Sequence, residues 1–278
     1  MKKNVKKLLS FAVLAFIIFF EVSYLGMTIA ATGDTVKVPI LLYHHINPIY
    51  PADTALANLT PEEFRLHMRT LIAQNYDFIS LRQYMDYVLY NTALPPKPVV
   101  ITFDDGYESN FTHAFPILQE FNIPATIFIV TETVGMQTGD VLNGNSVNFP
   151  HFTWEQAAEM EASGLIDIQS HGNKHQRITR MSLSDMQIQL RRSKFLIETK
   201  LNKTCDMFAY PYGDYSAASL NIARQAGIKA QILVSDNVGD INEVNVKSEG
   251  LESLKRLTVY GHMSNFELLN MIDEAMAG

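Results

Sequence analysis

The chain of 278 residues contains a single cysteine, Cys205, and its 22 Lys and Arg are outnumbered by 29 Asp and Glu. One thiol cannot close an intrachain disulfide, so stability has to come from a buried core, in which Cys205 is expected to be a small packing residue. The net charge of −7 lacks the basic excess that polyanion binding requires. These shortages argue against nucleic acid as a partner and favour a neutral or weakly charged substrate.

Only one long hydrophobic run is present, and it lies at the N-terminus. Four lysines among the first seven residues precede the apolar residues 8–20, and Ala30 and Ala31 come just before polar residues. This order is typical of a secretory signal cleaved after small residues. An uncleaved anchor is the alternative, because residues 8–31 could span a bilayer, although Glu21 would be costly there. We expect residues 1–31 to be a signal peptide or signal anchor and the chain's only membrane segment. Residues 32–278 would then lie outside the cytoplasm, in the cell envelope or the extracellular space.

The remaining chain alternates short apolar, β-branched runs with amphipathic segments, which is the pattern of a βα-repeating domain. Helix starts are readable at Thr60, Thr153 and Ser182, the first two as capping boxes. Roughly 247 residues follow the N-terminal segment, close to the ~250 typical of one (β/α) barrel. Residues 136–150, rich in Gly and Asn, are expected to form a loop insertion. The predicted strands are Val38 to Tyr43, Val99 to Thr102, Ala125 to Val130, Ile166 to Ser170, Met207 to Tyr210, Ile228 to Val234 and Leu257 to Tyr260.

Two adjacent aspartates, Asp104 and Asp105, follow the predicted strand at 99–102 and precede Gly106. Side chains alternate along extended backbone, so one carboxylate could bind a cation while its neighbour acts on water. The alternative is an ordinary Asp-Gly turn. In parallel barrels the chemistry collects at the carboxyl ends of the strands, which favours the functional interpretation.

A pair of histidines, His171 and His175, follows the predicted strand at 166–170. Residues four apart can face the same way on a helical turn, a spacing that suits two imidazole ligands of a divalent metal. A barrel would bring this pair to the same rim as the aspartates. Two His and one Asp with open coordination positions suit a hydrolytic zinc, and also non-haem iron.

These motifs, together with a third, resemble those of polysaccharide deacetylases with the NodB homology domain, or carbohydrate esterase family 4. The matching segments are Thr102 to Gly106, His171 to His175, and Phe208 to Gly213 with the sequence Phe-Ala-Tyr-Pro-Tyr-Gly. Segments at 42–44, 94–98, 116–118 and 125–128 are also similar, so the resemblance runs from about Val38 to the C-terminus. It implies a distorted (β/α)7 barrel forming a single catalytic domain over residues 32–278.

The resemblance also implies a reaction, the metal-dependent removal of acetyl groups from N-acetylated sugars in polymers. Asp105, His171 and His175 would hold Zn²⁺ or another divalent transition metal, and Asp104 would be the base that takes a proton from water. The oxyanion would be stabilised by the metal and by the backbone N–H of Tyr212.

The sequence departs from the family pattern at two places. Many members carry an arginine in the third motif that orients the catalytic aspartate, but Asp206 and Ala209 occupy those positions here, so another group would have to hold Asp104. A later motif usually supplies a histidine as general acid, and residues 255–262 resemble it only loosely. His262 is the predicted acid, with an exposed loop histidine as the alternative reading. His44, His45 or a water on the metal would be the next proton sources to consider.

Each of the remaining candidates could instead have a purely structural role. His44 or His45 could line the pocket or be satisfied by backbone, and Trp154 could stack on a sugar or pack its helix on the barrel. His67, His113 and His151 are expected at the surface.

The predicted function is therefore N-deacetylation of N-acetylglucosamine residues in a cell-wall or extracellular polysaccharide. The alternatives are an acetylxylan-type O-deacetylase and a catalytically silent carbohydrate-binding homologue. A glycosidase is disfavoured, because its two carboxylates must flank the scissile bond from opposite sides.

Overall fold

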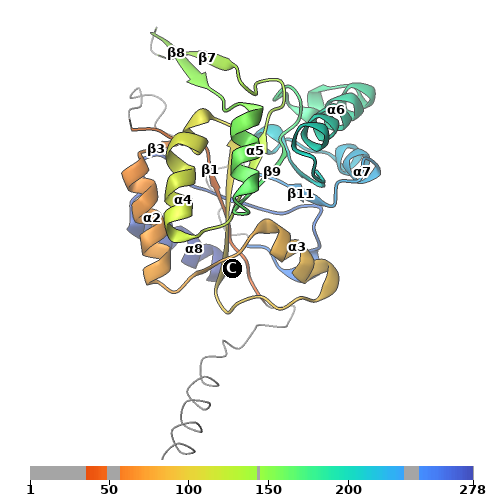
Figure 1. Cartoon of the computed structure of the whole chain (residues 1–278). Helices are drawn as coiled ribbons and strands as arrows, with labels where there is room; N and C mark the ends of the chain where they lie inside the picture. Colours follow the sequence, from red (N-terminus) through yellow and green to blue (C-terminus); the bar gives the residue numbers. More distant parts are fainter. Residues whose placement is uncertain (1–35, 49–56, 143–144, 235–243, 278) are drawn as a thin grey trace, which may run out of the picture.

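A computed structural model describes residues 36–48, 57–142, 145–234 and 244–277 (Figure 1). The predicted segment at 1–31 lies outside these residues. Within them, seven parallel strands form one curved sheet in the order β11-β10-β9-β6-β5-β1-β12, and β4 (Asp77–Phe78) pairs with β5 beside this path. The distorted (β/α)7 barrel is thereby confirmed. The seven strands lie within or overlap the predicted segments: β1 (Ile40–Tyr43), β5 (Pro98–Asp105), β6 (Ala125–Ile129), β9 (Ile166–Ser170), β10 (Met207–Ala209), β11 (Ala230–Ile232) and β12 (Leu257–Thr258).

The segment that leads into β12 joins the two edges of the sheet. Leu254 pairs with Ile232 of β11 in a parallel bridge, and the N–H of Leu233 donates to the Leu254 carbonyl at 2.7 Å. A few residues later, Leu257 pairs with Leu41 of β1. Residues 255 and 256 therefore cross between the edges of the sheet, where a side chain can point into the barrel.

Helices surround the strands because β5 and its neighbours are buried on both faces and need cover (Figure 1). Thr60, Thr153 and Ser182 cap their helices as predicted, each accepting from the backbone N–H three residues on. Ser80 makes a capping box that the sequence analysis missed. The helices are α2 (Pro61–Ala73), α3 (Leu81–Tyr90), α4 (Phe115–Phe121), α5 (Trp154–Ala162), α6 (Leu183–Leu201), α7 (Ala217–Gln225) and α8 (Asn265–Ala277). No helix in the described ranges is both long and apolar enough to cross a bilayer.

The predicted loop at 136–150 is instead largely an antiparallel hairpin, so that expectation was wrong. Strands β7 (Gln137–Leu142) and β8 (Asn145–Pro150) pair from Gln137 opposite Pro150 to Leu142 opposite Asn145. The polar composition suggested a loop, but the ladder needs only backbone groups. Asn143-Gly144, the dipeptide most typical of a two-residue hairpin turn, was the signal in the sequence that would have found it.

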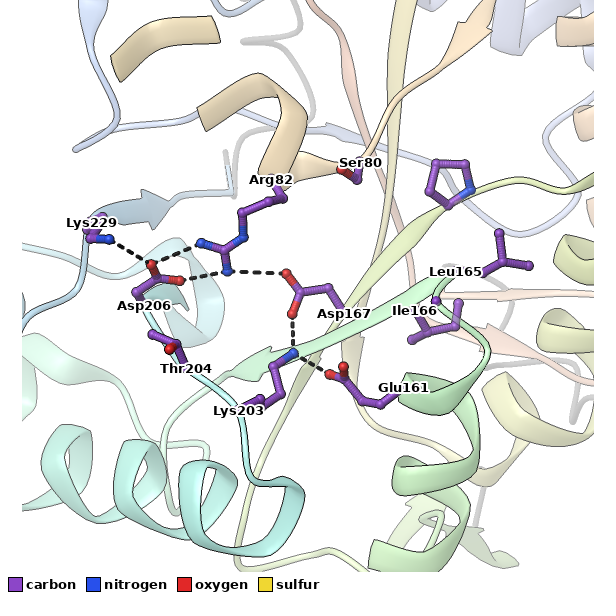
Figure 2. Close-up of a pocket in the computed structure, with 12 residues that line it drawn as sticks. Ser80, Arg82, Glu161, Leu165, Ile166, Asp167, Lys203, Thr204, Asp206 and Lys229 are labelled. Carbon is purple, nitrogen blue, oxygen red and sulfur yellow. Dashed lines mark hydrogen bonds and ion pairs between the residues drawn. The ribbon is translucent and has the colours of Figure 1, made fainter. Parts of the chain in front are cut away.

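A charged pocket of about 600 Å³ lies at the amino ends of β9 and β10, away from the strand ends that carry the predicted site (Figure 2). Arg82 lies between Asp206, which it contacts at 2.8 and 2.9 Å, and Asp167 at 3.5 Å. Lys203 contacts Asp167 and Glu161. Burial pushes the pKa of Asp206 upward, but the hydrogen bonds and charges of Arg82 and Lys229 outweigh it and hold that pKa below its ordinary value. Asp206 therefore links α3 to the amino end of β10 through Arg82, and it lies away from the predicted site.

Candidate active site

The carboxyl ends of neighbouring strands bring the predicted aspartates and histidines together. Asp105 ends β5 opposite Ile129 of β6, and Ile129 lies opposite Ser170, the last residue of β9. His171 follows directly, and its Nε2 lies 3.6 Å from Asp105 Oδ1 and 3.7 Å from Asp104 Oδ2. His175 Nε2 lies 3.3 Å from the same Asp105 oxygen. Residues far apart in the sequence thus form one cluster at the rim.

Asp105, His171 and His175 have the geometry of a metal site. One ligand atom from each lies within 4.8 Å of the others. Ligand atoms about 2.0–2.2 Å from a tetrahedral zinc are about 3.3–3.6 Å apart, and the two distances from Asp105 fit that range. Three ligands from protein leave a coordination position open, as in hydrolytic sites. The residues present therefore fit a divalent metal.

A backbone contact fixes the tautomer of His171. Its Nδ1 lies 2.9 Å from the carbonyl oxygen of Ala209 in β10. A carbonyl can only accept, so Nδ1 carries the proton and the lone pair of Nε2 faces the aspartates. Burial lowers the pKa of His171 more than the two aspartates raise it, so the ring is neutral, as a metal ligand must be.

Asp105 is held by partners that the sequence analysis did not assign. The Tyr107 hydroxyl bonds to its carboxylate, and His151 Nδ1 lies 3.1 Å from its carbonyl oxygen. Burial raises the pKa of Asp105, but His175, His171 and the other neighbours outweigh it and hold the pKa well below its ordinary value. His151 is 6% exposed and also contacts the Thr133 and Thr138 hydroxyls, so the surface expectation for it was wrong. It is buried because the hairpin folds over this rim.

Asp104 is held by Arg256, the orienting group that the third motif lacks. The guanidinium donates to both carboxylate oxygens, at 2.7 and 2.6 Å, and both side chains are buried. Arg256 Nε also donates to the Leu233 carbonyl at 3.2 Å, and this third hydrogen bond fixes the orientation of the guanidinium group. Burial raises the pKa of Asp104, but the charge and hydrogen bonds of Arg256, together with His171, outweigh burial and hold that pKa below its ordinary value. Asp104 is therefore ionised near neutral pH.

Left-handed backbone is concentrated at the predicted site residues. Apart from asparagines and glycines, the described residues with positive φ are Asp105 at 71°, His175 at 43°, Tyr212 at 60° and His262 at 61°. Such conformations cost of order 1 kcal/mol or more for these residue types, and they persist where surrounding structure imposes them. The turn at Asp105 keeps its carboxylate on the same side as Asp104, against the strict alternation expected of a strand. His171 and His175 meet through a loop and not on the helical turn that the sequence suggested.

Tyr212 lies beside His175, in the turn that follows β10. Its ring centroid is 4.5 Å from that of His175, and the Arg177 guanidinium lies 4.5 Å over it. The following residue must be glycine: a Cβ on Gly213 would lie 1.9 Å from the Val234 carbonyl oxygen, and its φ is 63°. The third motif therefore makes a tight turn that places the Tyr212 backbone at the rim.

The other histidines lie in different environments. The side chain of His262 is 60% exposed, and its Nδ1 lies 3.4 Å from Glu63 Oε1. His44 follows β1 level with Asp104, because Tyr43 pairs with Phe103, and its Nδ1 is buried without a hydrogen-bond partner among the described residues. His45 is buried, and its ring stacks on that of Tyr107 with 3.5 Å between the ring centroids.

Two further expectations concern residues away from the cluster. His67 is 1% exposed and contacts the Met263 carbonyl at 2.8 Å, so the surface expectation was wrong. Its spacing from Phe64 and Leu71 puts it on the buried face of α2. His113 is half-buried. Trp154 packs against the main core, in agreement with the packing interpretation.

Comparison with known proteins agrees with this fold. Residues 91–231 match the family model of polysaccharide deacetylases, and the chain belongs to that family. It is 27% identical to YxkH of Bacillus subtilis over 233 residues, which cover 84% of this chain and 75% of that protein. It is also 27% identical to the poly-beta-1,6-N-acetyl-D-glucosamine N-deacetylase of Staphylococcus epidermidis over 181 residues, which cover 62% of this chain but only 60% of that enzyme.

Solved structures share the fold. The Streptococcus pyogenes deacetylase PplD in complex with acetate superimposes with a TM-score of 0.72 at 26% identity, covering 85% of this chain and 98% of that one. IcaB from Ammonifex degensii, at 23% identity, has a TM-score of 0.69 and covers 84% of this chain and 96% of that one. The second likeness concerns the fold alone.

Proposed function

We propose that this protein is a metal-dependent polysaccharide deacetylase that hydrolyses N-acetyl groups of N-acetylglucosamine residues. The observation that carries the proposal is the pairing of Asp104 with Arg256 directly beside the cluster of Asp105, His171 and His175. An oriented, ionised carboxylate next to three candidate metal ligands is the arrangement that activates a water molecule for attack on an acyl carbon. The names of the staphylococcal relatives support an N-acetylated polymer as substrate.

Asp105, His171 and His175 would hold the metal, for which the donor set of two imidazoles and one carboxylate favours Zn²⁺. When bound, the metal supplies Lewis acidity: it polarises the acetamide carbonyl and lowers the pKa of water. Asp104 accepts the proton of the attacking water, and Arg256 keeps its carboxylate in place and charged. The Tyr212 backbone N–H is the proposed donor to the developing oxyanion.

The departing amine needs a proton, and two histidines are candidates for supplying it. His262 has the left-handed backbone also found at Asp105, His175 and Tyr212, but its side chain is largely exposed. His44 lies level with Asp104, and its charge contributes to lowering the pKa of both aspartates. His45 is disfavoured as the acid, because burial lowers its pKa to about 3 and leaves almost no protonated ring at neutral pH.

Single alanine variants separate these candidates. The true acid is expected to keep metal and substrate affinity when replaced, but to lose about 10²–10⁴-fold in kcat and to change the alkaline limb of the pH–rate profile. Placement beside Asp104 favours the larger loss in His44→Ala. If His44→Ala kept the wild-type kcat and pH–rate profile while His262→Ala lost kcat, His262 would be the general acid instead of His44. His113→Ala is the matched control, because His113 is half-buried and is not part of the Asp-His cluster.

Location outside the cytoplasm is also proposed, on the Lys-rich start and the apolar residues 8–20. Cell fractionation of a C-terminally tagged chain tests it. Release with a new N-terminus near Ala31, or retention in the membrane fraction, would agree with a cleaved signal or an anchor. Full-length soluble protein in the cytoplasm would contradict both.

Product analysis tests the proposed reaction. Incubation with N-acetylglucosamine oligomers is expected to release acetate and to lower the oligomer mass by 42 Da per event, as mass spectrometry would record. Acetylated xylan, which carries O-acetyl esters, should react more slowly. Faster release from xylan would favour an O-deacetylase. Binding of oligomers without acetate release would indicate a catalytically silent homologue.

A further inference from the structure

The backbone around the proposed metal ligand Asp105 is attached to the segment that returns from the β7–β8 hairpin. Tyr107 and His151 pair in an isolated antiparallel bridge, and the N–H of Phe152 donates to the Gly106 carbonyl at 3.2 Å. Figure 1 shows the hairpin itself projecting from the barrel. The hairpin therefore ends directly on the loop that carries Asp105.

The two bridged residues hold Asp105 at different atoms. The Tyr107 hydroxyl bonds to its carboxylate, whereas His151 Nδ1 lies 3.1 Å from its main-chain carbonyl oxygen. The φ of Asp105 is 71°, a left-handed value that this residue type keeps only where surrounding structure imposes it. This turn is what points the carboxylate toward His171 and His175. The bond from His151 acts on the backbone, so it supports the turn itself.

The neighbours of the His151 ring determine which of its nitrogens faces Asp105 as a donor. The Asp105 carbonyl can only accept, so Nδ1 carries a proton. The Thr133 hydroxyl, 3.2 Å from the same nitrogen, donates its own proton to the Val130 carbonyl at 2.9 Å and is therefore a second acceptor. Nε2 lies 2.9 Å from the hydroxyl of Thr138 in β7. A chain of hydrogen bonds thus runs from the hairpin strand through His151 to the backbone of Asp105.

From these contacts we infer that His151 is a positioning residue of the metal centre, which holds the left-handed backbone of Asp105 through Nδ1 and is itself held by Thr138. The affinity for the metal then depends on the hairpin β7–β8, although no hairpin residue is a ligand. The inference rests on the proposed metal-dependent function and adds to it a group that touches neither metal nor substrate. Hydrogen-bond partners of metal ligands generally orient the ligating side chain. His151 differs from them because it bonds to the main chain of the ligand.

Two substitutions of His151 separate its bond to Asp105 from its bond to Thr138. In His151→Asn the amide nitrogen reaches the place of Nδ1, so a donor to the Asp105 carbonyl is kept. In His151→Gln the longer side chain places its amide near Nε2, so the contact with Thr138 is kept and the donor to Asp105 is lost. Both variants replace the same buried ring by an amide, so general effects on folding are matched. His113→Gln, at a half-buried histidine outside the Asp-His cluster, is the control.

The measured quantity is the dissociation constant of Zn²⁺ from the metal-free full chain, obtained by competition with a chromophoric chelator. His151→Gln is expected to weaken binding by about 10–100-fold, whereas His151→Asn and the control should bind nearly as tightly as the wild type. The visible spectrum of Co²⁺ in the same site reports ligand geometry, and it should change in His151→Gln but not in His151→Asn. Thr138→Val keeps the side-chain shape but removes the partner of Nε2, so zinc binding should weaken several-fold. Circular dichroism shows which variants are folded, and Thr138→Val carries the test if His151→Gln is not.

The outcomes separate this inference from the proposed function. Equal losses in His151→Asn and His151→Gln would show that the metal site needs the packing of the ring and not the donor to Asp105, and the inference would be wrong. Wild-type zinc affinity in His151→Gln would overturn it as well, and wild-type affinity in Thr138→Val would overturn the dependence on the hairpin. All three results leave zinc binding and acetate release by the wild type intact. A wild-type chain that neither binds zinc nor releases acetate would instead contradict the proposed function.

Discussion

Asp104→Asn is expected to retain the metal while turnover falls by about 10²–10⁴-fold, the usual contribution of a general base. The amide cannot accept a proton from water, but Asp105, His171 and His175 are untouched. Elemental analysis and steady-state kinetics on N-acetylglucosamine oligomers would measure the two effects separately. Loss of metal together with activity would mean that Asp104 is a ligand and that the roles of the two aspartates are reversed.

Stability has to be followed in the same variant, because Asp104 is part of a buried ion pair. Asparagine presents an NH₂ group to one arm of Arg256, which itself only donates, so one buried donor loses its acceptor at a cost of about 1–3 kcal/mol. Thermal unfolding would show that the inactive variant is still folded at the assay temperature. Asp273→Asn on the exposed face of α8 is the matched control, with wild-type turnover expected.

Arg256→Lys is the companion variant, because it distinguishes orientation from simple charge. Lysine keeps the positive charge beside Asp104 but cannot make the two parallel bonds of the guanidinium fork. Turnover should therefore lie between those of the wild type and Asp104→Asn, with the metal retained. Wild-type turnover would show that a nearby cation suffices and that the fork is not required.

The sequence predicted the strands well because each is a short, buried, β-branched run between readable helix starts. The cluster of Asp104, Asp105, His171 and His175 was also predictable, since both motifs directly follow predicted strands and parallel strands end at one rim. Arg256 was not predictable. It lies 152 residues from Asp104 along the chain, and only the crossing of residues 255 and 256 between the sheet edges brings the two together.

The mistaken expectations have a common physical cause, which is that tertiary contacts can satisfy polar side chains that sequence alone places at the surface. His151 is buried because the hairpin β7–β8 brings it onto the carbonyl of Asp105. His67 is buried because the carbonyl of Met263, 196 residues away, accepts its hydrogen bond. The left-handed backbone at Asp105 and His175 was equally unpredictable, since Asp and His adopt this conformation more often than most residues but still only in a small minority of cases.

Removing any one of Asp105, His171 or His175 by alanine substitution is expected to abolish both metal binding and activity. Two ligands cannot complete the three-residue set of a catalytic zinc site. Changing only the hydrogen-bond partners of metal ligands already costs about 10–100-fold in affinity, so loss of a ligand should exceed that. Metal content after dialysis, measured by elemental analysis, and acetate release would decide the matter.

His175→Ala is the most informative of the three, because its side chain is 31% exposed whereas that of His171 is 3% exposed. Truncation of His171 empties a buried position and destabilises the fold by itself, whereas His175→Ala should unfold near the temperature of the metal-free wild type. A ligand that binds only the folded state stabilises it by about 2.7 kcal/mol at a hundredfold excess over Kd. Added Zn²⁺ should therefore raise the unfolding temperature of the wild type and of His113→Ala, but not that of His175→Ala. A full zinc-dependent shift in His175→Ala would place the metal on other residues.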